Sequence, residues 1–246
     1  MLTLDISFKA KTGHVGSALS IKDILTALYF SVMGRGDKFI LSKGHAAASL
    51  YAALYKKGIL SEKELDFFGQ DGGLCEHPEA VTPGVEMTAG SLGHGLAFGV
   101  GIAHGQKLLK IKSRTFVLIS DGECDEGSIW EAALLAPQLK LDNLVAIVDY
   151  NRWQCFGRTK EVINLDPLGD KWSAFGWEVK SVDGHNISDI LKIFSRIPFR
   201  KGKPSLIIAK TNSGKGIPLI ENKLIGHYKV FSEDEYKLAR EHLEKL

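Results

Sequence analysis

The sequence predicts an α/β fold in which helices cover both faces of a parallel β-sheet. Short apolar runs without Gly or Pro alternate with helix-like segments along the 246 residues, which is typical of consecutive β-α units. Loops that contain Gly, His or Asn follow several of these runs, and α/β sheets bind ligands where their strands end. At this length we expect a single domain over residues 1–246.

The clearest unit is residues 115–151. Thr115–Ser120 is a β-branched and apolar run, which suits a buried parallel strand. It ends at Asp121, and a polar loop leads into an amphipathic helix from about Ser128 and then into a second apolar strand. Because a right-handed β-α-β connection brings both strand ends to one edge of the sheet, Asp121 and Asn151 should lie together.

The other elements follow from the same patterns, taken in chain order. The predicted strands are 38–42, 115–120, 143–149, 177–182 and 204–210. The predicted helices are 21–32, 46–57, one after Ser61, one from the glycines at 90–95 to about 110, one from 128, 167–175, 188–196 and one after Ser232. Ser-x-x-Asp or Ser-x-x-Glu patterns at Ser20, Ser61 and Ser232 resemble capping boxes. Residues 69–95 and 211–231 are Gly-rich and are expected to be loops.

Composition argues against several classes of protein. Lys and Arg number 31 against 29 Asp and Glu, without a basic block, so we expect no nucleic-acid partner. The 3 cysteines lack C-x-x-C spacing, which predicts reduced thiols in a cytoplasmic protein. No apolar run approaches the length of a membrane span and no signal peptide opens the chain, so no membrane association is expected.

Asp121 and Asn151 are candidate metal ligands. A carboxylate and a carboxamide are hard oxygen donors, which favour Mg²⁺ or Ca²⁺ over zinc. Since Mg²⁺ commonly completes its shell with water and phosphate oxygens, the unit suggests a diphosphate held through a metal ion. An EF-hand does not fit, because Glu126 and Ala132 stand where that loop needs Gly and Glu. A dinucleotide fingerprint does not fit either, because the loop has no G-x-G-x-x-G.

The segment D-G-E-x-x-E-G-x-x-W-E-A-A from Asp121, followed by Asn151, resembles the thiamine diphosphate motif of transketolases. That family usually has Gly where Ser120 stands. The resemblance implies the thiamine-diphosphate-binding fold known as the PP domain, with thiamine diphosphate and Mg²⁺ (or Ca²⁺) as cofactors. It implies that Asp121, Asn151 and the main-chain oxygen of Trp153 bind the metal, and that Gly122 and Asn151 contact the cofactor.

The resemblance extends to the histidines. K-T-G-H-V-G around His14, L-S-K-G-H ending at His45 and H-P-E from His77 match family segments, and His227 resembles the last active-site histidine. The resemblance implies that His14, His77 and His227 recognise substrate hydroxyls and move protons, and that His45 lies near the cofactor diphosphate. None of these histidines has zinc-ligand spacing to another, so we expect no zinc cluster.

Residues 90–95 resemble the Gly-x-Leu-Gly-x-Gly loop of the family. The implied cofactor contacts in this loop are Gly90, Ser91 and Leu92. Gly lets the main chain approach a ligand, and a helix start offers free N–H groups to phosphate. Glu126 matches an acidic residue at the subunit interface that is linked to the other cofactor. Further along, Gly99 and Gly101 are expected to let the helix pack tightly on the sheet.

The resemblance covers nearly the whole chain but only one half of the family's proteins. The Glu that activates thiamine lies in a second, pyrimidine-binding domain, so the implied partner is a C-terminal transketolase subunit in an α₂β₂ assembly. The implied reaction transfers a two-carbon ketol unit from a ketose (phosphate) to an aldose, and the isolated chain should be inactive.

Alternatives remain open. The chain could be a subunit of a 1-deoxyxylulose-phosphate synthase-like enzyme or of a 2-oxo acid dehydrogenase, or a non-catalytic scaffold subunit. The segments at His45 and His77 and the Trp130-Glu131-Ala132 string favour transketolase. Val15, His94 and Ser120 differ from the commonest family pattern, which leaves a specialised sugar pathway open.

Overall fold

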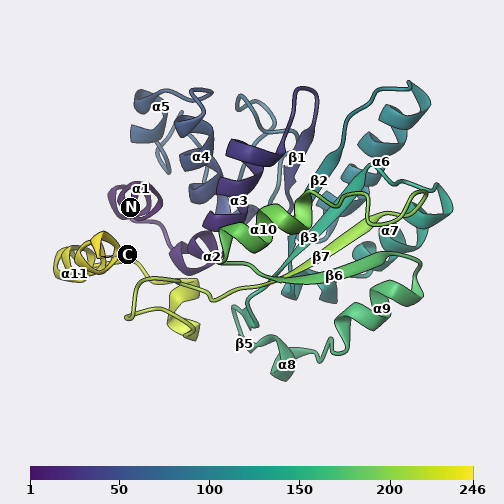
Figure 1. Cartoon of the computed structure of the whole chain (residues 1–246). Helices are drawn as coiled ribbons and strands as arrows, with labels where there is room; N and C mark the ends of the chain where they lie inside the picture. The colour runs from purple at the N-terminus through teal and green to yellow at the C-terminus, as the bar shows by residue number, and fades with distance from the viewer. Residues whose placement is uncertain (246) are drawn as a thin grey trace.

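A parallel sheet of five strands, in the order β1-β2-β3-β7-β6, forms the centre of the protein (Figure 1). The computed structural model describes residues 1–245. The strands are β1 (Lys38–Leu41), β2 (Thr115–Ser120), β3 (Leu144–Tyr150), β6 (Glu178–Asp183) and β7 (Ser205–Lys210). All neighbouring pairs are parallel, which confirms the predicted α/β class.

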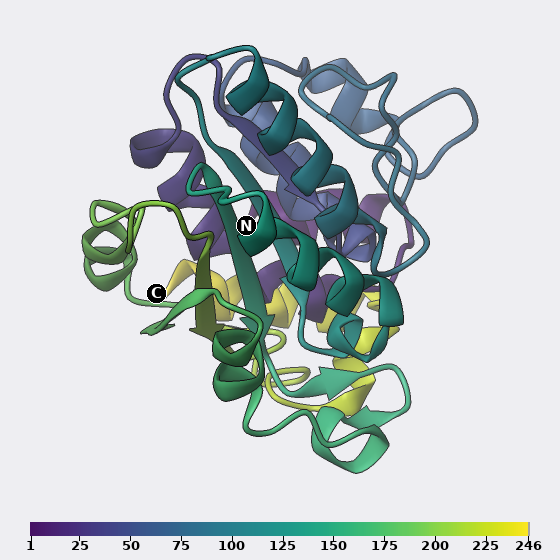
Figure 2. The ribbon, with the colours of Figure 1, turned by 90° about the vertical axis from the view of Figure 1, so that its right-hand side faces the viewer.

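Helices cover both faces of the sheet because its central strands are apolar on both sides. In β2, Phe116 and Leu118 belong to one core, whereas Val117 and Ile119 belong to the other. The first core is covered by α2 (Val15–Ser20), α3 (Lys22–Ala27), α4 (Ala47–Lys56) and α10 (Ile187–Phe194). The second is covered by α6 (His94–Leu108), α7 (Gly127–Gln138) and α9 (Leu168–Ala174); α6 and α7 lie across the sheet in Figure 2.

The two ends of the described chain meet at one side of the molecule (Figure 1). α1 (Leu2–Lys9) contacts α11 (Glu233–Glu244), and the rings of Phe8 and Tyr236 stack with centroids 4.0 Å apart. Leu4, Leu19 and Phe231 belong to a third apolar cluster between these segments. This cluster holds the segment before His14 against the segment after His227.

Shorter elements complete the fold. They are η1 (Leu28–Val32), a π-helical turn that continues α3; η2 (Gly44–Ala46); α5 (Glu62–Asp66); η3 (Gly122–Asp125); the hairpin of β4 (Trp153–Gln154) and β5 (Gly157–Arg158); α8 (Thr159–Val162); and η4 (Leu224–His227). Within residues 1–245, no helix is long and apolar enough to span a membrane.

Most predicted elements are confirmed, and the capping boxes show where local patterns fail. Ser61 and Ser232 form the predicted boxes with Glu64 and Glu235. The prediction for Ser20 is wrong: this residue ends α2, and its hydroxyl donates to the Asp149 carboxylate at 2.6 Å. A hydrogen bond donated to a buried, ionised carboxylate is stronger than one that a capping hydroxyl accepts from a main-chain amide, so the tertiary contact is preferred.

The structure refines one further expectation and corrects another. The polar loop predicted after Asp121 is partly buried, because Glu123 and Cys124 lie in the 3₁₀ turn η3 and are 0% exposed. Gly99 packs on the sheet as expected, since an added Cβ would lie 2.3 Å from the Val117 side chain. Gly101 does not, because nothing lies within 4 Å of an added Cβ.

Candidate active site

A cavity of about 300 Å³ opens where the strands of the sheet end. Residues from most of the segments singled out in the sequence line it: His14, Ser17, His45, His77, Gly90, Leu92, Ser120, Gly122, Asn151, Trp153, Gln154, Cys155, His227 and Tyr228. The parallel register brings the ends of β1, β2 and β3 to one edge, which explains why segments distant in sequence meet here.

Four histidines converge in this cavity. The ring centroid of His14 lies 5.2 Å from that of His45, 6.3 Å from that of His77 and 5.1 Å from that of His227. The main chain supports this cluster, since the amide of His14 donates to the carbonyl of His227 at 2.9 Å. His14 has a left-handed backbone with φ of 61°, an uncommon conformation for a non-glycine residue.

Most of these imidazoles are neutral at physiological pH. Burial, with His77 and Lys43 nearby, lowers the pKa of His14 to about 4. Burial, with His14 and Lys43 nearby, lowers the pKa of His227 to about 4. Burial also holds the pKa of His45 well below its usual value. A neutral imidazole has one donor and one acceptor nitrogen, and the buried Nδ1 of His14 has no hydrogen-bond partner within residues 1–245.

Asp121 is 0% exposed and does not itself line the cavity, although its neighbours Ser120 and Gly122 do. Its carboxylate accepts hydrogen bonds from the main-chain amides of Gly122 (2.9 Å) and Arg152 (2.7 Å) and from the Thr159 hydroxyl (3.1 Å). Burial and the nearby Asp149 raise the pKa of Asp121 to about 7. Within the described residues no Lys or Arg side chain pairs with it, so the site favours a bound cation there.

Asn151 and Trp153, on either side of Arg152, carry the other oxygen atoms that the sequence predicts as metal ligands. Asp121 bonds to the amide of Arg152, so its carboxylate is tied to the segment Asn151–Trp153. A carboxylate, a carboxamide and a main-chain carbonyl are the donors that Mg²⁺ or Ca²⁺ prefers. No group of three His, Cys, Asp or Glu side chains between residues 1 and 245 has a metal-binding arrangement, so a metal here would need these amide and carbonyl oxygens.

The Gly-rich loop before α6 is fixed by Glu123, whose importance the sequence alone did not indicate. Its carboxylate accepts from the amides of Gly93 (2.9 Å) and Ser120 (3.0 Å) and from the Ser42 hydroxyl. The Gly95 amide donates to Ser42 Oγ at 3.1 Å. The expectation that this helix start offers free N–H groups is therefore wrong for Gly93 and Gly95, because the protein's own side chains use them.

Some predicted residues lie outside the cavity. Ser91 and Glu126 are exposed and do not line it, and their roles stay predictions. Four residues that the sequence did not single out do line it: Ser17, Gln154, Cys155 and Tyr228. Gln154 and Cys155 belong to the hairpin that follows Asn151, and Tyr228 follows His227, so nearness to a motif was the available signal.

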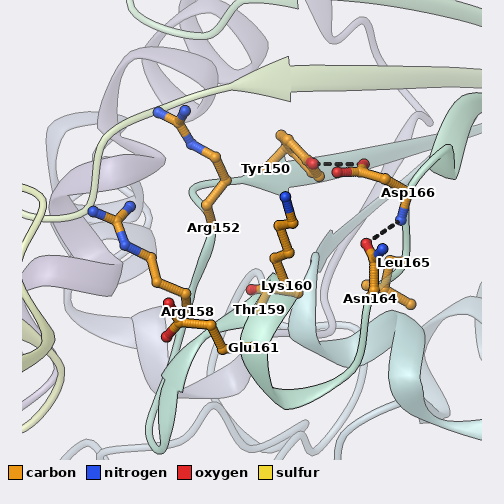
Figure 3. A pocket seen from close by; sticks show the side chains of 9 residues that line it. All are labelled: Tyr150, Arg152, Arg158, Thr159, Lys160, Glu161, Asn164, Leu165 and Asp166. Carbon is orange, nitrogen blue, oxygen red and sulfur yellow. Dashed lines mark hydrogen bonds between the residues drawn. The ribbon is translucent and has the colours of Figure 1, made fainter.

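A second cavity, of about 290 Å³, is lined by residues that include Tyr150 and Arg152 from the same segment of the chain (Figure 3). Side chains of alternate residues enter different cavities: Tyr150 and Arg152 face this one, whereas Asn151 and Trp153 face the histidines. Tyr150 donates to Asp166 at 2.8 Å, which joins this wall to the segment before α9.

Comparison with known proteins identifies the family. Residues 1–244 match the family model "Transketolase, thiamine diphosphate binding domain". The chain is 42% identical to one subunit of the apulose-4-phosphate transketolase of Phocaeicola vulgatus, over 99% of this chain and 92% of that one. It is 41% identical to the 6-deoxy-6-sulfo-D-fructose transketolase subunit SqwG of a Clostridium species, over 99% of this chain and 93% of that one.

Solved structures of transketolases are similar to this chain over nearly its whole length. The transketolase of Campylobacter jejuni superposes with a TM-score of 0.92 at 34% identity, over 99% of this chain and 41% of that one. The transketolase of Pichia stipitis in complex with sedoheptulose 7-phosphate gives 0.92 at 30% identity, over 98% of this chain and 39% of that one. This chain thus spans less than half the length of these enzymes. It belongs to the transketolase family, and residues 1–244 form the thiamine diphosphate binding domain of that family.

Proposed function

We propose that this protein is the diphosphate-binding subunit of a two-chain transketolase. The enzyme would transfer a two-carbon ketol unit from a ketose (phosphate) donor to an aldose acceptor. The observation that carries the proposal is the convergence of His14, His45, His77 and His227 in one cavity, which both chain neighbours of the buried Asp121 also line. Two similar proteins of nearly matching length are named transketolase subunits, which supports a partner chain.

The chain's own residues fit the cofactor. Asp121, Asn151 and the carbonyl of Trp153 would bind Mg²⁺, and Gly122, Gly90 and Leu92 would border the diphosphate. His45 would lie beside that diphosphate, as the L-S-K-G-H segment that ends at His45 implies. Bound thiamine diphosphate supplies a nucleophilic carbon and stabilises the carbanion that cleavage of a ketose leaves.

The remaining histidines would act on the sugar. His14 and His227 are neutral, so each imidazole can accept a proton from one hydroxyl and donate a hydrogen bond to another. His77 lines the same cavity, with its ring centroid 6.3 Å from that of His14. Several imidazoles in one cavity suit a polyhydroxylated substrate, because each can contact a different hydroxyl group.

The partner would carry the pyrimidine-binding domain, and we propose an α₂β₂ assembly in the cytoplasm. The two named relatives act on different sugars yet have almost the same identity to this chain, so the donor and acceptor need a direct assay.

The test is reconstitution. The chain is purified alone and together with the C-terminal transketolase subunit, each with Mg²⁺ and thiamine diphosphate, and ketol transfer is assayed with a ketose phosphate and an aldose. We expect activity only in the mixture. Ketol transfer by the isolated chain would refute the two-chain assignment, and a mixture that consumes pyruvate but no ketose would refute the transketolase assignment.

A further inference from the structure

Lys43 and Asp149 form an ion pair inside the protein, beneath the candidate site. Both side chains are 0% exposed, and Lys43 Nζ lies 2.5 Å from Asp149 Oδ2. Lys43 follows β1 and Asp149 lies in β3, so the pair joins the two strands that flank β2. Lys43 also donates to the carbonyl of Ser17, a residue that lines the cavity, at 3.2 Å.

Asp149 makes a second contact, with Asn151. The Nδ2 group of Asn151 donates to Asp149 Oδ2 at 2.8 Å, while its Oδ1 accepts from the main-chain amide of Trp153 at 2.8 Å. An ionised carboxylate can only accept, so Asp149 can hold only the nitrogen end of the amide. The contact therefore fixes which end of the Asn151 carboxamide is turned toward Trp153, with which it lines the cavity.

Stability alone does not account for this pair. Burying two charges costs free energy that their attraction offsets only with good geometry, and replacing such a pair with apolar residues is often neutral or stabilising. Here the hydroxyls of Ser20 and Thr211 also donate to Asp149, so the carboxylate accepts from four different residues. A fully satisfied buried network has one rigid arrangement, which suits the positioning of a ligand.

We propose that Lys43 and Asp149 are positioning residues that hold Asn151 ready for the metal ion. Asp149 takes the amide nitrogen and so leaves the amide oxygen as the metal donor. Lys43 compensates the charge of Asp149, so that the cation binds at Asp121 and Asn151 instead of at Asp149. This inference rests on the proposed function, because it assumes that Asn151 binds the metal of a thiamine diphosphate site.

The test is the double variant Lys43→Met/Asp149→Val, which removes both charges and leaves neither one buried alone. We expect Mg²⁺-dependent binding of thiamine diphosphate, measured by titration calorimetry, to weaken about 10- to 100-fold, as is common when a partner of a metal ligand is lost. Adding Asn151→Ala to the double variant should weaken binding little beyond Asn151→Ala alone, because both changes disable one ligand.

Two further measurements separate positioning from a general structural role. In the metal-free protein, the side-chain amide protons of Asn151 should exchange with solvent faster in the double variant than in the wild type. Ser49→Ala removes a buried hydrogen bond to the Ala18 carbonyl, outside this network, and should leave both exchange and affinity unchanged. The proposal would be overturned if the double variant bound thiamine diphosphate with wild-type affinity. It would also be overturned if the triple variant lost as much binding free energy as the double variant and Asn151→Ala lose together.

Should the double variant fail to fold, Lys43→Met/Asp149→Asn keeps the size of residue 149 and an acceptor oxygen for Asn151. We then expect a protected Asn151 amide and nearly normal affinity, whereas a protected amide with lost affinity would contradict the proposal. A wild-type protein that binds no thiamine diphosphate would refute the proposed function instead, and the exchange of the Asn151 amide would still decide whether Asp149 orients it.

Discussion

Asp121 is a fully buried carboxylate whose donors within residues 1–245 are two amides and a hydroxyl. Its pKa of about 7 means that the folded protein binds a proton there at mildly acidic pH, which an unfolded chain would release. With this raised pKa, the metal-free protein should lose stability as pH rises from about 4 to 7. A cation that replaces the proton removes this cost.

Mg²⁺-dependent binding of thiamine diphosphate should therefore strengthen with pH. Because the metal competes with the proton on Asp121, we expect affinity about tenfold lower at pH 6 than at pH 8. Titration calorimetry at both pH values measures this. Asp121→Asn is the control. This variant should bind thiamine diphosphate more weakly at both pH values, and any pH dependence of its affinity should come from titration of the cofactor's phosphate groups. Equal pH dependence in the two proteins would contradict the assignment.

His14 and His227 should matter for turnover more than for cofactor binding. In the reconstituted enzyme, His14→Asn and His227→Asn should each lower kcat about 10²–10⁴-fold, the range for a lost acid–base partner. Thiamine diphosphate affinity should change less than about threefold, because these rings are assigned to substrate. His94→Gln, at an exposed position outside the cavity, should behave like the wild type. If either variant lost cofactor affinity by as large a factor as it lost kcat, that histidine would be assigned to cofactor binding instead of to the substrate.

At the scale of the elements, α6 holds the Gly-rich loop against the sheet. Its first residues contact the end of β1, because an added Cβ on Gly95 would lie 2.4 Å from the Cβ of Ser42. Further along the helix, Gly99 faces β2 and Gly101 faces open space. Glycine is thus needed at Gly99 for close packing, and at Gly101 it only lowers helix propensity.

Alanine at these two positions should have opposite effects. Gly99→Ala should lower the free energy of unfolding by about 1–3 kcal/mol, because its Cβ would meet Val117 at 2.3 Å and the helix would have to shift. Gly101→Ala should raise it by up to about 1 kcal/mol, since alanine favours the helix and meets no neighbour. Urea unfolding of the isolated chain measures both. Equal effects would mean that the register of α6 on β2 is wrong.

At the scale of the whole molecule, the candidate site for the diphosphate lies within this chain. The cavity combines segments from residue 14 to residue 228, and the third apolar cluster brings the first and last of them together. The diphosphate end of the cofactor should therefore bind without the partner chain, even though catalysis needs it.

Inorganic pyrophosphate with Mg²⁺ should stabilise the isolated chain against heat, and thiamine without phosphate should not. At about 100 times the dissociation constant, the expected gain in unfolding free energy is about 2.7 kcal/mol. Thermal unfolding with and without EDTA measures it, and Asn151→Ala should show a much smaller gain. Stabilisation by thiamine alone would mean that the chain also holds the ring end of the cofactor.

Local sequence determined the strands, most helices and the edge of the sheet at which the candidate site lies. Apolar runs such as 115–120 and 204–210 can only be buried, and the residue that follows a buried parallel strand must emerge at the ligand-binding edge. Asp121 and Asn151 were predictable for this reason. The roles proposed for the histidines came from the resemblance to transketolases, because no local pattern predicts them.

Only the tertiary structure decided which side chains meet. Ser20 looks like a helix cap in sequence, yet its hydroxyl bonds to Asp149, far along the chain. Lys43 resembles a surface lysine until β1 and β3 are placed on either side of β2, which buries it against the same carboxylate. Periodicity reports whether a residue faces inward. Which partner it then finds depends on strand order and helix rotation, and these are set by the packing of the whole chain.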